Sequence, residues 1–164
     1  MFMCFQQGRL STRQSASDEK MIKIGKRVTI SNNLNYQLYE AGCLSVKDVA
    51  IIISYSGETG KTLRVAMECK KRSVPVIALT SFGENSLTKY AACKLTISTK
   101  ESLFQDLGDF STHLSVSLLL DILYAAYFQQ DYNGNYQRKL ERTSLLERFR
   151  KSTNSIIMGG EEKE

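Results

Sequence analysis

The sequence is poor in the residues that most often mark special chemistry. Its 164 residues include one proline, no tryptophan and one histidine, His113. The four cysteines, Cys4, Cys43, Cys69 and Cys93, are scattered without any C-x-x-C pair. A zinc site needs clustered cysteine or histidine ligands, so we expect no metal site and no cofactor. We interpret the cysteines as free buried thiols in a reducing compartment.

Long hydrophobic runs are also missing. The longest apolar stretches, such as Val49 to Ile53 and Leu118 to Leu120, are far too short to span a bilayer. The apolar start, Met1 to Phe5, has no basic region before it and is shorter than the apolar core of a secretory signal, which needs about 7–15 residues. We therefore expect a cytoplasmic protein without membrane contact.

The net charge is positive but dispersed. Lysine and arginine number 22 against 17 aspartates and glutamates, which gives a charge of +5 and a pI of about 9.0. Even the densest basic segment, Arg138 to Lys151, includes Glu141 and Glu147. This interleaving favours a solvated helix face over a nucleic-acid surface. Because we find no helix-turn-helix before the predicted sheet, we expect no DNA contact by this chain alone. A positive field would still attract phosphorylated ligands.

Short apolar runs alternate with segments of helical periodicity. We expect strands at Lys26–Ile30, Asp48–Ser54, Val74–Leu79 and Lys94–Ser98, with helices at Leu34–Gly42, Glu58–Arg72 and Asn85–Ala92 between them. In the second helix, the apolar residues Leu63, Ala66 and Met67 share a face. Apolar strands that alternate with helices predict a parallel sheet covered on both faces, that is, an α/β/α sandwich.

Two further helices are predicted after the last strand. The first, Thr112 to Gln130, carries apolar residues over more than one stripe: Leu114, Leu118, Leu119, Ile122, Leu123, Ala126 and Tyr127. A helix that is apolar around so much of its circumference must be buried on several sides. We therefore expect a homodimer in which this helix meets its copy. Asn133 to Lys151 predicts a polar second helix, and residues 152–164 a mobile tail.

The segment that carries chemistry is Ala50 to Thr62, AIIISYSGETGKT. In a parallel sheet, ligands bind at the carboxyl ends of the strands, and the first turn of the following helix offers N–H groups to an anion. Gly57 allows a tight turn, while Ser54, Ser56 and Thr59 add hydroxyl donors. The pattern predicts a phosphate cradle. The alternative is that these hydroxyls merely cap the helix.

The same segment nearly spells a P-loop, which requires G-x-x-x-x-G-K-[ST]. Gly60, Lys61 and Thr62 match the end of that pattern, but Tyr55 stands where the first glycine is needed. The later strands also end without an acid that could bind magnesium. We therefore place Lys61 and Thr62 on the helix and do not expect a nucleotide triphosphatase.

Asp48 to Thr59, DVAIIISYSGET, resembles the signature of SIS (sugar isomerase) domains, in which a strand ends in S-x-S-G-x-T and cradles a sugar phosphate. Within that superfamily, SYSGET, Lys20–Lys26 (KMIKIGK) and Ser117–Tyr124 (SLLLDILY) are most similar to the effector domain of RpiR-type transcriptional regulators. The resemblance covers roughly Ser15 to Arg150. It implies a mostly parallel sheet of five strands, a dimer, and phosphosugar binding that controls a DNA-binding domain.

The sequence departs from the family pattern near its start. Only Met1 to Gln14 precedes the matching region, so we expect a fragment of a longer regulator that lacks the N-terminal helix-turn-helix domain. The first strand of the family ends in G-x-G-x-S, and of that loop only Gly8 and Ser11 remain. We accordingly divide the chain into a remnant of the first strand and loop (1–14), the SIS domain (15–151) and the tail (152–164).

The resemblance also implies the ligand contacts. Ser54, Ser56 and Thr59 would hold the phosphate, helped by the amides of Gly57 and Glu58. The expected function is to sense a phosphorylated sugar as the effector domain of a sugar-responsive transcriptional regulator.

Outside this segment, Ser11 and Glu101 would be further contacts to the ligand. In one alternative the chain is a sugar-phosphate aldose–ketose isomerase, with Glu101 moving the proton and His113 opening the ring. In another it is a dimerisation module that has lost its ligand. A single acid without an established partner is weak evidence for catalysis, so binding is favoured over an enzyme.

Overall fold

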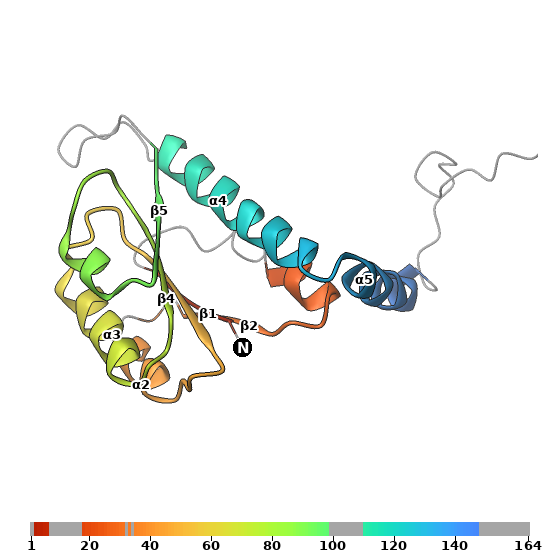
Figure 1. The fold of residues 1–164 in the computed structure, drawn as a ribbon, viewed down its shortest axis with the longest axis horizontal. Helices are drawn as coiled ribbons and strands as arrows, with labels where there is room; N and C mark the ends of the chain where they lie inside the picture. The colour runs from red at the N-terminus through yellow and green to blue at the C-terminus, as the bar shows by residue number, and fades with distance from the viewer. Residues whose placement is uncertain (1, 7–17, 32, 34, 99–109, 148–164) are drawn as a thin grey trace, which may run out of the picture.

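The computed structural model describes residues 2–6, 18–31, 33, 35–98 and 110–147. Within these residues, five strands form one sheet (Figure 1). They are β1 (Phe2–Gln6), β2 (Val28–Ser31), β3 (Val49–Ile53), β4 (Val76–Thr80) and β5 (Cys93–Thr96), in the spatial order β2-β1-β3-β4-β5. All neighbouring pairs are parallel. The predicted α/β class with a parallel sheet of about five strands is confirmed.

The central strand β3 supplies side chains to two apolar cores, one on each face of the sheet. Ala50 and Ile52 belong to the core under α2 and α3, whereas Ile51 and Ile53 belong to the core under α4. Successive side chains of a strand point to opposite faces. A strand buried on both faces must therefore be apolar throughout, which is why this segment reads as an uninterrupted apolar run.

One face is covered by α2 (Gln37–Gly42), α3 (Gly60–Lys71) and a short 3-10 helix, η1 (Ser86–Tyr90) (Figure 1). The side chains of α3 that are buried against the sheet are those of Thr62, Val65, Ala66 and Cys69. The predicted apolar face of Leu63, Ala66 and Met67 is wrong at Met67, which is 51 % exposed. The helix instead turns Thr62 and Cys69 toward the sheet.

Two boundaries on this face also differ from the prediction. α3 begins at Gly60 instead of Glu58, because Thr59 before it is still extended, with φ −66° and ψ 118°. The short helix predicted for Asn85–Ala92 is only the 3-10 helix η1. The Asn85 side chain begins it by accepting a hydrogen bond of 3.3 Å from the Thr88 amide.

The other face is covered by α4 (Phe110–Gln129), which packs on the sheet through Val116 and Leu120 (Figure 1). Its outer stripe remains open: Leu114 and Leu118 are each 61 % exposed and Ile122 is 51 % exposed. By length and composition alone, residues 111–129 of this helix could cross a membrane. No uninterrupted apolar run in the sequence indicated this, because polar residues such as Ser115 and Ser117 divide the segment.

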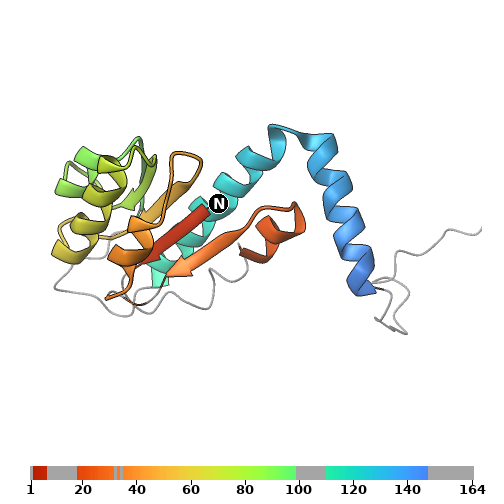
Figure 2. The ribbon, with the colours of Figure 1, turned by 90° about the horizontal axis from the view of Figure 1, so that it is seen from below.

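Helix α5 (Tyr132–Glu147) turns away from the sheet at the end of α4 (Figure 2). A chain of aromatic contacts lines the bend between the two helices: the ring centroids of Tyr124 and Phe128 are 5.7 Å apart, those of Phe128 and Tyr132 5.5 Å, and those of Tyr132 and Tyr136 6.1 Å. The predicted polar second helix is thus confirmed as far as Glu147. The expected mobile tail, 152–164, lies outside the described residues.

Candidate functional site

The loop that follows β3, residues 54–59, lies at the carboxyl edge of the sheet. The chain passes from β1 to β2 on one side of β1 and later adds β3 on its other side. Gln6, the last residue of β1, is paired with Ile53, the last residue of β3, so the two strands end together. Such a topological switch point leaves a crevice at the strand ends, where open α/β sheets bind their ligands.

The backbone of this loop is held to the neighbouring strand. The Ser54 amide donates to the Leu79 carbonyl over 3.0 Å, and the Tyr55 carbonyl accepts from the Ser81 amide over 3.0 Å and from the Thr80 hydroxyl over 3.2 Å. These bonds extend the pairing of β3 with β4 beyond the last strand residue. The first residues of the loop are therefore hydrogen-bonded to β4 and to the residue that follows it.

Gly57 forms the sharp turn of the loop. Its φ is +66°, a conformation that side-chain-bearing residues avoid. A Cβ at this position would overlap the side chain of Asn85. Asn85 is itself fixed by its donation to the Thr80 hydroxyl over 2.9 Å, and the Gly57 carbonyl accepts from the Leu87 amide over 3.0 Å. The sequence indicated Gly57 but not Asn85, since their contact joins the loops of two different strands.

Glu58 points out of the loop toward η1. Its carboxylate accepts a hydrogen bond of 2.7 Å from the Ser86 amide, and this bond lowers the pKa of Glu58 below its ordinary value. The Glu58 amide donates to the Ser56 hydroxyl over 3.3 Å. The Glu58 side chain therefore anchors η1, while its amide lies within the loop beside the predicted phosphate contacts.

The start of α3 suits an anion. Thr59 is the N-cap residue by position, yet its side chain makes no capping hydrogen bond, and the first turn contains no acidic residue. An ordinary helix start has a hydroxyl or carboxylate cap and acids nearby that offset the positive end of the dipole. The interpretation of the hydroxyls as simple caps is therefore wrong for Thr59. Lys61, in the same turn, adds a positive charge and donates to the Asn35 side chain over 3.2 Å.

The structure brings together five of the predicted binding residues in one loop: Ser54, Ser56, Gly57, Glu58 and Thr59. Ser54 is buried, whereas Ser56 and Thr59 are partly exposed. The predicted contacts Ser11 and Glu101 lie outside the described residues, as does Gly8.

His113 lies in the first turns of α4. Two residues further on, Ser115 accepts a hydrogen bond of 3.1 Å from the Ser98 amide, which ties this end of α4 to the chain leaving β5. The structure therefore puts His113 at the carboxyl edge of the sheet. No contact of its side chain with the loop is observed in the described part of the chain.

In the part of the chain that the structure describes, no three histidine, cysteine, aspartate or glutamate side chains cluster. Cys69 is buried, and burial raises the pKa of its thiol to about 11, so it is uncharged at neutral pH. Cys43 and Cys93 are free but exposed, so the expectation of buried thiols is wrong for these two.

Comparison with known sequences and structures gives a consistent result. The sequence pattern of the SIS domain matches residues 20–125. A curated relative, described as an uncharacterized HTH-type transcriptional regulator of Caldanaerobacter subterraneus, is 32 % identical over 82 % of this chain and 47 % of its own length. The chain spans about half the length of the curated relatives it matches.

Two solved structures share the fold. The Vibrio vulnificus NanR protein complexed with ManNAc-6P superposes with a TM-score of 0.79 at 22 % identity, over 92 % of this chain and 57 % of NanR. The sugar isomerase domain of an RpiR transcription factor from Sphaerobacter thermophilus gives a TM-score of 0.65 at 18 % identity, over 87 % of this chain and 78 % of that domain.

Proposed function

Because the chain belongs to the SIS domain family, we propose that it binds a phosphorylated sugar as the effector domain of a sugar-responsive transcriptional regulator of the RpiR type. The observation that carries the proposal is the start of α3. It lies at the switch point of the sheet and lacks both a side-chain cap and an acid, and three hydroxyls precede it in the loop. The NanR structure, which holds ManNAc-6P, and the relative described as an HTH-type regulator support the ligand class and the regulatory role.

The phosphate would take the place of a cap. Its oxygens would accept hydrogen bonds from the first amides of α3 and from the hydroxyls of Ser54, Ser56 and Thr59. The Glu58 amide, now donating to Ser56, would be shared with the ligand. The Glu58 carboxylate points at Ser86 and so leaves the anion site free of negative charge. Ser11 and Glu101 would contact the sugar from the loops after β1 and β5.

The remaining parts of the proposal concern the assembly. The open stripe of α4 would pack against a second copy, which gives the regulator a dimeric effector core in the cytoplasm. DNA recognition would come from a separate domain, in agreement with the share of the relatives that this chain covers.

An isomerase would need a free acid or base beside the sugar carbons. The one carboxylate of the described loop, that of Glu58, accepts a hydrogen bond from the Ser86 amide and so points away from the anion site, whereas the other candidate, Glu101, lies outside the described residues. The described loop thus offers groups for binding an anion and no free acid or base of its own, which favours binding without turnover.

The deciding experiment is a thermal-shift and calorimetric screen against hexose, pentose and amino-sugar phosphates, ManNAc-6P included, with the unphosphorylated sugars alongside. A ligand at about 100 times its Kd stabilises the folded state by about 2.7 kcal/mol. We expect a phosphate-dependent shift that Ser56→Ala abolishes. Ser144→Ala, an exposed serine on α5, is the matched control and should behave like wild type.

Two results would contradict the proposal. No shift with any sugar phosphate, from a folded chain, would leave a dimerisation module that has lost its ligand. Interconversion of an aldose phosphate and a ketose phosphate, followed by NMR, would make the chain an isomerase.

A further inference from the structure

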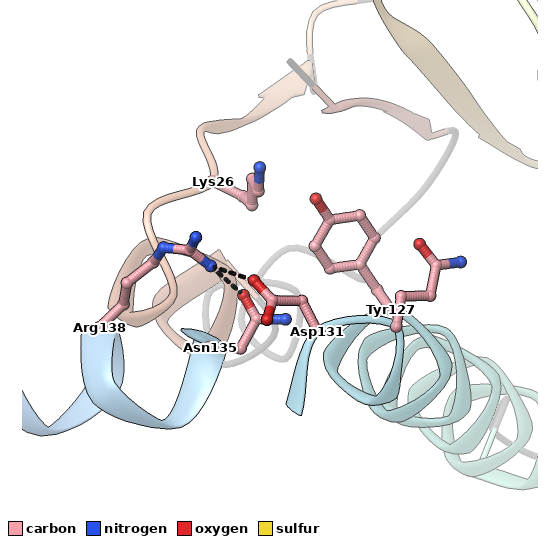
Figure 3. Close-up of a pocket in the computed structure, with 6 residues that line it drawn as sticks. Lys26, Tyr127, Asp131, Asn135 and Arg138 are labelled. Carbon is pink, nitrogen blue, oxygen red and sulfur yellow. Dashed lines mark hydrogen bonds and ion pairs between the residues drawn. The ribbon is translucent and has the colours of Figure 1, made fainter. Parts of the chain in front are cut away.

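A polar cavity of about 260 Å³ opens at the bend between α4 and α5 (Figure 3). Its lining residues come from three parts of the chain: Lys26, Tyr127, Gln130, Asp131, Asn135 and Arg138. Lys26 precedes β2, so the cavity lies toward the amino edge of the sheet, whereas the loop after β3 lies at the carboxyl edge. The two sites are therefore separate.

Arg138 is fixed in this cavity by two hydrogen bonds that use a single nitrogen. Its Nη1 donates to the Asp131 carboxylate over 3.1 Å and to the Asn135 side-chain oxygen over 2.9 Å (Figure 3). Neither bond uses Nη2 or Nε. Among the described residues, the donors of Nη2 and Nε therefore remain available on one edge of the guanidinium, and such an edge matches the two oxygens of a carboxylate or phosphate.

Asn135 is the buried member of this arrangement. It is only 2 % exposed, and its side-chain nitrogen donates to the Phe128 carbonyl over 3.1 Å. Asp131 also caps the start of α5, because its other carboxylate oxygen accepts a hydrogen bond of 3.1 Å from the Gly134 amide. The Asp131 and Asn135 side chains that bind Arg138 are thus themselves hydrogen-bonded to the backbone where α4 ends and α5 begins.

Lys26 supplies a second cation. Its Nζ lies 5.5 Å from the centre of the Tyr127 ring, and it makes no ion pair within the described residues. Two cations thus face one carboxylate around the cavity, and that carboxylate is already engaged by Arg138 and by the start of α5. The cavity retains a net positive charge.

From this geometry we propose that the cavity is a second ligand site, for a small molecule that carries a carboxylate or phosphate group. The oxyanion accepts from the free edge of Arg138 and from Lys26. The volume lies just under the usual range for small-molecule sites, which limits the ligand to a compact anion. Because Lys26 leads into β2 and Arg138 belongs to α5, a bound anion ties α5 to the sheet.

The test is an NMR titration of the ¹⁵N-labelled chain at constant ionic strength. Malonate and inorganic phosphate are added separately, each against sodium chloride. We expect saturating shifts at the amides of Gln130 and Asn135 with at least one oxyanion and not with chloride. Malonate alone would identify carboxylates as the ligand class, and phosphate alone would identify phosphates. Ser56→Ala must leave these shifts unchanged, because the cavity is separate from the loop after β3.

Substitutions of the lining residues test whether the oxyanion binds in this cavity. Arg138→Gln and Lys26→Gln should each weaken the binding roughly tenfold, the usual effect of a charge-assisted hydrogen bond. Lys139→Gln removes the same charge from the neighbouring position of α5, outside the cavity lining, and should change the affinity less than about twofold. The proposal is overturned if neither oxyanion gives saturating shifts, or if Lys139→Gln weakens binding as much as Lys26→Gln does. Lys26 takes no part in the Asp131–Asn135 framework, so that comparison stands even if Arg138→Gln disturbs the fold.

Discussion

The side chain of Asn85 occupies the space that any side chain at Gly57 would need. The two residues belong to the loops after adjacent strands, β3 and β4, and Asn85 is also the residue that begins η1. The turn of the candidate phosphate loop is thus shaped by its neighbour as well as by its own glycine. Changes at either residue should affect both loops.

Gly57→Ala tests this relationship. Holding an alanine at a φ of +66° costs about 1–2 kcal/mol, and the displacement of Asn85 adds to it. We expect a loss of at least about 2 kcal/mol in the free energy of unfolding, measured by urea denaturation, together with loss of sugar-phosphate binding.

Gly60→Ala is the matched control for that substitution. Gly60 is the first residue of α3, and a Cβ there would meet nothing within 4 Å. Alanine is the better helix former, so the variant should be as stable as wild type or slightly more stable. Equal destabilisation by the two substitutions would show that Asn85 does not restrict position 57.

Thr59→Ala separates a ligand contact from a helix cap. Removing a hydroxyl that caps a helix costs about 1 kcal/mol, but the Thr59 side chain makes no capping bond. We expect a change in unfolding free energy of less than about 0.5 kcal/mol and at least a tenfold loss of sugar-phosphate affinity, the usual effect of one charge-assisted bond. A loss of stability near 1 kcal/mol without the loss of affinity would make Thr59 an ordinary cap.

Glu58 should contribute to the pH dependence of stability. The Ser86 amide lowers the pKa of its carboxyl below the ordinary value of 4.5. A lowered folded-state pKa stabilises the protein above the unfolded-state value, and this contribution disappears as the pH falls through the folded-state value. Glu58→Gln should therefore flatten the fall in melting temperature between about pH 6 and pH 3. Glu141→Gln, on α5, should retain the wild-type profile.

The sheet could be predicted well, because strands buried on both faces must be apolar throughout. The run from Val49 to Ile53 and the polar residues after it located β3 and the candidate loop directly. The helix faces could not be predicted as well. Thr62 is buried and Met67 is exposed, although hydrophobicity alone ranks them the other way. The orientation of α3 on the sheet decides which of the two side chains is buried, and this orientation cannot be predicted from the local sequence pattern.

The support of the candidate loop could not be predicted for a related reason. Asn85 packs against Gly57, and the Ser86 amide donates to the Glu58 carboxylate. Asn85 and Ser86 nevertheless follow the next strand of the chain, β4. Read alone, Asn85 signals only the start of a helix, which is also how the segment Asn85–Ala92 was predicted. Its second role arises only when parallel pairing sets the loops after β3 and β4 side by side.

The outer stripe of α4 should hold two copies of the chain together. Leu114, Leu118 and Ile122 follow one another at intervals of four residues and are all more than half exposed. Leu118→Glu would bury a charge in the expected interface, and a symmetric dimer carries the substitution twice. About a tenfold weakening per copy gives about a hundredfold increase in the dimer Kd, which analytical ultracentrifugation can measure.

Met67→Glu provides the control for that measurement. Met67 is 51 % exposed on α3, which covers the opposite face of the sheet from α4. Because both substitutions replace an exposed apolar side chain by a carboxylate, they differ only in the face that they change. Dissociation by Leu118→Glu but not by Met67→Glu would assign the interface to α4, whereas a monomeric wild-type chain at high concentration would show that α4 does not join two copies.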